Sequence, residues 1–230
     1  GQKAENITPG IGCVVYTAAI HRDNPELIEA VVQKIPMLTR AELLGQLMKN
    51  YETPIAVSGT HGKTTTTSMI SHILLAGDLD PTISVGGILK AIGGNIRVGH
   101  SGTFITEACE YTNSFLHFFP KISVILNIEE DHLDFFKDLE DIRHSFRQFT
   151  ELLPEDGTLV INADITDYQE IYEGLPCRVV TYGTSADCDY SADNIAYDEN
   201  GHVSFDLMKK GQFADHIVLS VTGDHNVSNA

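Results

Sequence analysis

A glycine-lysine-threonine turn between an apolar strand and a helix constrains this chain more than any other feature. The turn reads Ser58-Gly59-Thr60-His61-Gly62-Lys63-Thr64-Thr65 and follows the apolar run 55–57. At such a turn glycines let backbone N–H groups point at phosphate oxygens, a lysine adds a point charge, and a threonine hydroxyl is a ligand for Mg²⁺. The helix that follows contributes its positive N-terminus. The turn therefore predicts a nucleoside triphosphate site in an α/β domain.

This turn departs from the general P-loop pattern. That pattern places a glycine five residues before Gly62, where this chain has Val57, so the signature of the common nucleotide kinases and GTPases is absent. The alternative is an ordinary strand-to-helix turn with a surface lysine. The apolar strand before the turn, the hydroxyl run 64–67 and the helix-like segment 69–75 all favour the phosphate site.

Several blocks further along the chain carry a resemblance to a known family. They are Asp80-Pro81-Thr82, Gly86-Gly87, Glu107-Ala108-Cys109-Glu110-Tyr111, Ser114-Phe115-Leu116, Asn127-Ile128-Glu129 and Asp131-His132-Leu133-Asp134. In their order and spacing, and together with the turn, these blocks resemble the Mur ligases, which build the stem peptide of peptidoglycan. Within that family they are most similar to the branch that adds the first amino acid. The resemblance covers nearly the whole chain.

The composition limits the partners and the compartment. The net charge of −17 argues against nucleic acid or an anionic membrane surface as a partner. The four cysteines, Cys13, Cys109, Cys177 and Cys188, form no C-x-x-C pair and predict reduced, mostly buried thiols of a cytoplasmic protein. No signal-peptide pattern and no run of eighteen apolar residues occurs. The sequence does not indicate an oligomeric state.

We expect three segments along the chain. Residues 1–50 resemble the C-terminal part of a Rossmann-like domain, which in the family holds the UDP end of the substrate. Residues 51–222 resemble the central ATP-binding domain, and residues 223–230 a linker and the start of a C-terminal domain. In the first segment, Asn24-Pro25 predicts a helix to about Lys34, and Thr39-Arg40-Ala41-Glu42 predicts a capping box before a second helix.

The predicted fold class is α/β, with a mainly parallel, P-loop-type central sheet flanked by helices. We expect strands over 12–17, 55–57, 103–106, 122–126, 158–161 and 178–182. After Tyr190 the pattern changes to short runs at 195–197, 202–207 and 217–221, with Asn200-Gly201 as a strong hairpin signal. These runs predict a small antiparallel sub-sheet.

Carboxylates near the turn are candidate metal ligands, because Mg²⁺ prefers oxygen donors. Glu107 is expected at the carboxyl end of a parallel strand, where ligands collect in such folds. For Glu110, Glu129 and Glu130 the sequence favours solvated surface charges. By resemblance, Glu107 is the Mg²⁺ glutamate of the family, and His132, which follows a second strand, contributes to a second divalent cation.

The resemblance assigns three kinds of site residue. The catalytic residues are Lys63, Glu107 and His132, and the metal ligands, for Mg²⁺ or Mn²⁺, are Thr64, Glu107 and His132. The ATP-binding residues are Gly59, Thr60, His61, Gly62, Lys63, Thr64, Thr65, Asn226 and Asn229, although His61 has the alternative of only shaping the turn and the two asparagines that of capping a helix. Tyr111, Asn113 and Ser114 are expected to line the end of the substrate that carries the sugar carboxylate.

The reaction implied by the resemblance is ATP-dependent ligation of L-alanine to the lactyl carboxylate of UDP-N-acetylmuramate through an acyl phosphate. Two further hypotheses within the same fold are a muropeptide-recycling ligase, which adds a tripeptide to the same sugar nucleotide, and a folate polyglutamylating enzyme. A hypothesis of another class is a non-catalytic ATP-binding fragment. We expect this chain by itself to be inactive in ligation, since relatives keep further catalytic residues in a C-terminal domain.

Overall fold

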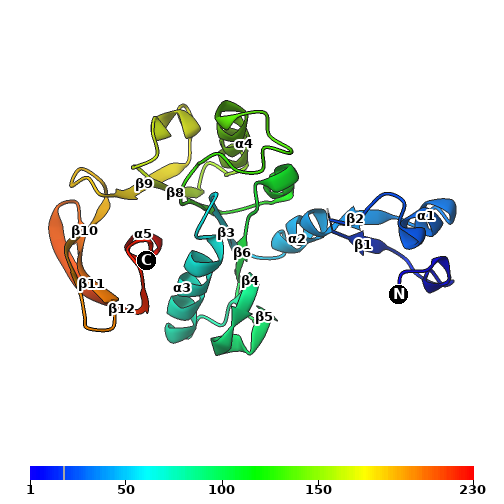
Figure 1. Cartoon of the computed structure of the whole chain (residues 1–230), viewed down its shortest axis with the longest axis horizontal. Coiled ribbons are helices and arrows are strands. Elements are labelled where there is room, and N and C mark those ends of the chain that lie inside the picture. The colour runs from blue at the N-terminus through cyan, green and yellow to red at the C-terminus, as the bar shows by residue number, and fades with distance from the viewer. Residues whose placement is uncertain (18) are drawn as a thin grey trace.

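The computed structural model describes residues 1–17 and 19–230, and within these residues the chain forms two sheets (Figure 1). A small parallel pair near the N-terminus consists of β1 (Val14–Tyr16) and β2 (Met37–Thr39). The second sheet has ten strands in the order β12-β11-β10-β9-β8-β7-β3-β6-β4-β5. Its strands are β3 (Thr53–Ser58), β4 (Thr82–Leu89), β5 (Gly94–Arg97), β6 (Thr103–Glu107), β7 (Ile122–Ile125), β8 (Thr158–Asn162), β9 (Arg178–Gly183), β10 (Tyr190–Tyr197), β11 (His202–Lys209) and β12 (Gln212–Thr222).

The predicted α/β class is confirmed, with antiparallel strands only at the two edges of the large sheet. The strands from β10 to β4 in the sheet order pair in parallel, whereas β5 runs antiparallel to β4, and β11 and β12 form antiparallel hairpins. The expected sub-sheet is therefore present. It continues the main sheet, because Tyr190 of β10 pairs in parallel register with Tyr182 of β9.

Three strands, β2, β4 and β5, were not among the strands that the sequence predicted. The Gly86-Gly87 pair lies inside β4, and β5 is a short edge strand that begins at Gly94. Glycine is unfavourable within strands, so local propensity opposes this assignment. Parallel pairing of β4 with β6, for example Ile83 with Ile105, makes the strand possible.

The first two α-helices begin at the capping residues that the sequence predicted. The side chain of Asn24 accepts hydrogen bonds from the first turn of α1, and the Thr39–Glu42 capping box opens α2. The α-helices are α1 (Pro25–Val32), α2 (Arg40–Met48), α3 (Lys63–Ala76), α4 (Leu139–Thr150) and α5 (His225–Asn229), and the short 3₁₀ turns are η1 (Ala4–Asn6), η2 (Lys90–Ile92), η3 (Tyr111–His117) and η4 (Tyr168–Ile171). No helix in the part of the chain that the structure describes is long and apolar enough to cross a membrane.

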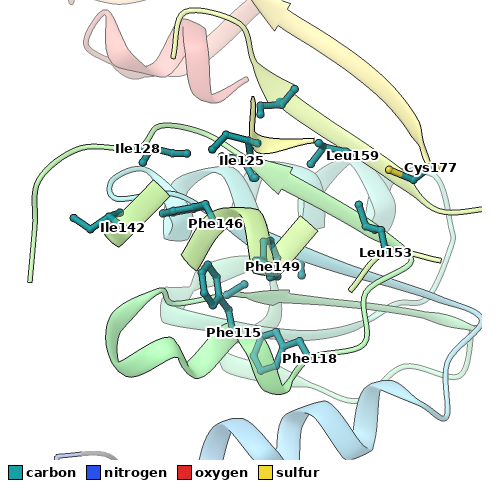
Figure 2. Packing of buried hydrophobic residues seen from close by; sticks show 14 of the residues in the cluster. Phe115, Phe118, Ile125, Ile128, Ile142, Phe146, Phe149, Leu153, Leu159 and Cys177 are labelled. Atoms are coloured by element: carbon teal, nitrogen blue, oxygen red, sulfur yellow. The ribbon is translucent and has the colours of Figure 1, made fainter. Parts of the chain in front are cut away.

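The large sheet separates two apolar cores. One face packs against α4 and η3, where the rings of Phe115 and Phe149 stack at 4.6 Å and Phe146 meets Phe115 edge-on (Figure 2). On the other face Ile55 and Val57 of β3 pack near α3. Because successive side chains of β3 enter opposite cores, the strand that carries the predicted turn is buried on both sides. The turn is thus attached to a rigid element.

The N-terminal unit is joined to this core by α2 (Figure 1). Met48 is fully buried in the α4-side core and Leu44 packs against it. Gly45 lies so close to the carbonyl oxygen of His117 in η3 that an added Cβ would sit 1.9 Å from it. Only glycine therefore allows α2 to approach η3 this closely.

All four cysteines are free thiols, as predicted, although only half of them are buried. Cys177 and Cys188 are buried, whereas Cys13 and Cys109 are exposed. The expectation of mostly buried thiols was wrong for Cys13 and Cys109, because both lie in segments beside strand ends rather than within the core.

Candidate nucleotide-binding site at the carboxyl edge of the sheet

The predicted site residues converge because three parallel strands end at one edge. β3 lies between β6 and β7. The loop 59–62 follows β3, Glu107 is the last residue of β6, and Asn127 comes two residues after β7. In open parallel sheets ligands bind outside these carboxyl ends. The topology therefore brings the turn and the first acidic block to one place.

The loop itself requires its two glycines. Gly59 has φ +141° and Gly62 has φ +84°, both in the region that L-residues rarely adopt. A Cβ on Gly59 would lie 2.9 Å from the Cβ of Leu126, and one on Gly62 would lie 2.5 Å from Oδ1 of Asn229. No described side chain caps the start of α3 at Lys63. Its first-turn N–H groups therefore remain directed at the loop, in the manner of an anion site.

Asn127 clamps this loop, a role that the sequence did not predict. The backbone N–H of His61 donates to Oδ1 of Asn127 at 2.7 Å, and Nδ2 of Asn127 donates to the carbonyl oxygen of His61 at 3.1 Å. The Thr60 hydroxyl accepts from the backbone N–H of Glu129 at 2.9 Å. The His61 ring points outward, with 65 % of the side chain exposed. The contacts of His61 with Asn127 are thus made by its backbone.

Lys63 is held by three acceptors above the loop. Its Nζ lies 2.5 Å from the carbonyl oxygen of Gly59, 3.0 Å from that of Thr60 and 3.0 Å from Oε2 of Glu110. Glu110 is only 2 % exposed. The expectation of a solvated surface charge was wrong for Glu110, because its side chain is buried and its carboxylate is paired with the Lys63 ammonium. Glu129 and Glu130 are exposed, as expected.

Thr64, the residue after Lys63 in the first turn of α3, forms a solvent-exposed hydrogen-bonded pair with Glu107, which we call the open pair. The Thr64 hydroxyl donates to Oε2 of Glu107 at 3.0 Å, and the backbone N–H of Gly86 donates to Oε1. A Cβ on Gly86 would lie 2.9 Å from the Glu107 carboxylate, so a larger residue there would displace that side chain. Two oxygen donors side by side, with room for phosphate and water ligands, fit Mg²⁺, which is usually held by few protein groups.

His132 lies beside Glu110. Its Nε2 is 3.9 Å from Oε1 of Glu110, and its ring contacts that of Tyr111 in a tilted arrangement, with 4.5 Å between centroids. The Tyr111 hydroxyl donates to Asp134 at 2.8 Å, which raises the pKa of that hydroxyl. His132 itself has φ +51°, a strained backbone that the surrounding contacts maintain. Among residues 1–17 and 19–230, no three His, Cys, Asp or Glu side chains converge as a metal-binding group.

The C-terminal helix α5 closes the site from the other side, next to α3 (Figure 1). The Thr66 hydroxyl donates to the carbonyl oxygen of Asn229 at 3.1 Å. The two predicted asparagines contact each other, with Nδ2 of Asn229 donating to Oδ1 of Asn226 at 3.2 Å, and Asn226 is buried. The structure therefore brings both asparagines to the glycine loop, which lies more than 160 residues earlier in the chain.

The expected substrate-lining residues lie in η3. Thr112 and Asn113 both adopt left-handed backbone angles, with φ +55° and +56°. The Ser145 hydroxyl donates to Oδ1 of Asn113, and the hydroxyls of Thr112 and Ser114 are 3.0 Å apart. The amide oxygen of Asn113 is thus used to hold η3 against α4. Such strain at non-glycine positions is typical of binding sites.

Comparison with known families agrees with this geometry. Residues 57–230 match the Mur ligase middle domain, and residues 1–52 match the profile described as the Mur ligase family, catalytic domain. The chain belongs to the Mur ligase family. The resemblance to this family and the predicted fold class are therefore confirmed.

Relatives of known name are similar over the whole chain. The UDP-N-acetylmuramate–L-alanine ligase of Lachnospira eligens is 60 % identical over 230 residues, which is all of this chain and 50 % of the relative. That of Lachnoclostridium phytofermentans is 55 % identical over all of this chain and 51 % of its own length. The chain thus spans about half the length of the curated relatives it matches.

Two solved structures of the family share the fold at similar quality. The UDP-N-acetylmuramate–alanine ligase of Thermotoga maritima superimposes with a TM-score of 0.84 and 27 % identity, covering all of this chain and 51 % of that one. The UDP-N-acetylmuramate:L-alanyl-gamma-D-glutamyl-meso-diaminopimelate ligase of Neisseria meningitides gives 0.87 and 26 %, covering all of this chain and 74 % of that one. The fold therefore does not separate these two kinds of ligase.

Proposed function

We propose that this chain is the nucleotide-binding part of an ATP-dependent ligase that joins L-alanine to the lactyl carboxylate of UDP-N-acetylmuramate in peptidoglycan synthesis. The observation that carries the proposal is the 60 % identity, over all 230 residues, to a relative of that name. The glycine loop, the free first turn of α3 and the Thr64–Glu107 pair support ATP and Mg²⁺ or Mn²⁺ as the cofactors.

In this proposal the positively charged and N–H groups of the site bind phosphate, and its oxygen groups bind the metal. Lys63 lies over the loop, where its ammonium would meet the β/γ-phosphates, and the first-turn N–H groups of α3 would bind the same oxygens. Thr64 and Glu107 would hold Mg²⁺, which when bound supplies positive charge between the triphosphate and the attacking carboxylate. Asn226 and Asn229 would contact the purine or ribose from α5. His132 stays a candidate ligand for a second cation.

Positioning dominates the chemistry of such a site. A carboxylate that attacks the γ-phosphorus meets a triphosphate of the same sign, so the reaction needs fixed positive charge and alignment of the two groups. Lys63 and the α3 N-terminus supply fixed positive groups at the end of a strand that is buried on both faces. An acyl phosphate formed there would then react with the amine of L-alanine.

The proposal includes the division of the chain and its compartment. We assign residues 1–50 to the end of the UDP-substrate domain, residues 51–222 to the ATP-binding domain and residues 223–230 to the entry into a C-terminal domain. The packing of α2 on the core of the large sheet makes the first boundary a close contact between units. Use of ATP and free cysteines support a cytoplasmic enzyme.

A phosphate-release assay on the full-length gene product tests the proposal. We expect release that depends on ATP, UDP-N-acetylmuramate and L-alanine together. Release with the tripeptide L-alanyl-γ-D-glutamyl-meso-diaminopimelate and not with L-alanine would assign the protein to the recycling activity. Absence of ATP binding by calorimetry would contradict both activities.

A further inference from the structure

The ammonium of Lys63 has no hydrogen-bonding capacity left. A lysine ammonium has three N–H donors, and three acceptors lie within 3.0 Å of it: the carbonyl oxygens of Gly59 and Thr60 and the Glu110 carboxylate. A phosphate oxygen can therefore bind Lys63 only when one of these three contacts is released. Which contact is released decides where the positive charge lies during the reaction.

The Glu110 contact is the most costly of the three to break. Glu110 is 2 % exposed, and among the described residues Lys63 is the hydrogen-bond donor to its carboxylate. Nε2 of His132 lies 3.9 Å from Oε1 of Glu110, which is outside hydrogen-bond distance. Separating a buried ion pair leaves an uncompensated buried charge, whereas releasing a neutral carbonyl loses one ordinary hydrogen bond.

The backbone around Glu110 is fixed from both sides. The N–H of Ala108 donates to the carbonyl oxygen of Val57 at 2.8 Å, which ties the segment to β3. The N–H of Asn113 donates to the carbonyl oxygen of Glu110 itself at 2.9 Å, and the fully buried Phe115 anchors η3 in the core. The carboxylate therefore projects from a rigid support.

We propose that Glu110 is a positioning residue that keeps hold of Lys63 while ATP binds, so that a phosphate oxygen replaces a loop carbonyl and not the carboxylate. This inference rests on the proposed function. Glu110 fixes the ammonium at one point, and preorganised charge of this kind acts on the transition state. The carboxylate also cancels part of the lysine charge, so it does not strengthen ground-state binding of the triphosphate.

The test compares Glu110→Gln with wild type in the full-length gene product. Gln keeps the size of the side chain and one acceptor oxygen but removes the charge that holds Lys63. We expect kcat for phosphate release to fall about tenfold or more, while the Kd of ATP measured by calorimetry stays equal or becomes a few-fold tighter. The Kd of adenosine, which has no phosphate, stays unchanged. Glu130→Gln, which changes an exposed glutamate in the same way, serves as the matched control.

A second variant separates position from charge. Glu110→Asp keeps the carboxylate but withdraws it by one methylene, so we expect kcat to fall here too. Wild-type kcat in either variant would overturn the inference. So would a parallel weakening of ATP and adenosine binding with a lower Tm, since that pattern reports a purely structural role. If wild type itself bound no ATP, the proposed function would fail first.

Discussion

Glu107 and Glu110 are three residues apart, and each contacts one of two neighbouring residues of α3. Glu110 pairs with Lys63 and Glu107 with Thr64, but the two pairs differ in their exposure to solvent. Glu110 is buried and closed by Lys63, whereas Glu107 accepts from the exposed Thr64 in an open pair. The closed pair is part of the folded structure, because its charges compensate each other away from water. The open pair keeps oxygen atoms available for a metal. Under the proposed function, one short segment would provide both a fixed charge and a metal ligand.

The largest expected effect concerns what both pairs can do in the 230-residue chain itself, which spans about half the length of the relatives it matches. The 230-residue chain contains the loop, both carboxylates and α5, so we expect it to bind ATP and Mg²⁺. Reacting groups that are not held together lose a proximity contribution of roughly 7–11 kcal/mol, and ligation should be undetectable. Calorimetry measures the binding, and mass spectrometry measures the product. Any UDP-N-acetylmuramoyl-alanine formed would show that this chain suffices.

The closed pair is broken most directly by Lys63→Ala. We expect this variant of the full-length protein to lose turnover, because the cation facing the phosphates is gone. It should also lose about 3–5 kcal/mol of stability, because Glu110 is left buried without a partner. Thermal unfolding followed by circular dichroism measures the second effect.

A double variant provides the control for Lys63→Ala. Adding Glu110→Gln removes the uncompensated charge, so the Tm should recover in part while turnover stays absent. Equal Tm values for wild type and Lys63→Ala would mean that the pair carries no energy in solution and that the comparison with Glu107 fails.

The open pair is tested by Glu107→Ala. We expect phosphate release to fall roughly 10²–10³-fold, the scale of losing one preorganised electrostatic group, and Mg²⁺-dependent ATP binding to weaken. The Tm should change little, since the Thr64–Glu107 pair faces solvent. Glu110→Ala should show the reverse, with a lower Tm and a smaller change in the Mg²⁺ dependence. If metal titrations showed that Glu110→Ala weakens Mg²⁺-dependent ATP binding more than Glu107→Ala does, the roles of the two carboxylates would be exchanged.

The smallest effect is expected for the ion pair between Asp80 and Arg97, which includes neither Glu107 nor Glu110. Hydrogen bonds from Arg97 first, and then from the backbone and ring of His100, lower the pKa of Asp80 to about 2. A lowered pKa in the folded state stabilises the fold above the unfolded value of 3.8, and this stabilisation is lost as the pH falls toward 2. The Tm difference between wild type and Asp80→Asn should therefore shrink between pH 5 and pH 2. A constant difference would show that Asp80 acts through neutral hydrogen bonds.

Short-range features of the chain were predicted well. The caps at Asn24 and Thr39, the hairpin at Asn200-Gly201 and the glycine turn each depend on residues within a few positions of one another. Their conformations follow from local sterics and hydrogen bonds, so the residue types suffice. The strand β4 was missed for the same reason, since its glycines oppose a strand locally and only pairing with β6 overcomes this.

The residue order of this chain determined its fold class and the position of the glycine turn between β3 and α3, because both depend on local pattern. Tertiary structure alone decided that Glu110 is buried on Lys63, that Asn127 clamps His61 and that Asn229 closes over Gly62. These contacts join residues 47, 66 and more than 160 positions apart. Whether a glutamate is a solvated charge or a buried counter-ion depends on which distant group excludes water from it. That group is set by the packing of η3 and the order of the strands, which no local window of sequence contains.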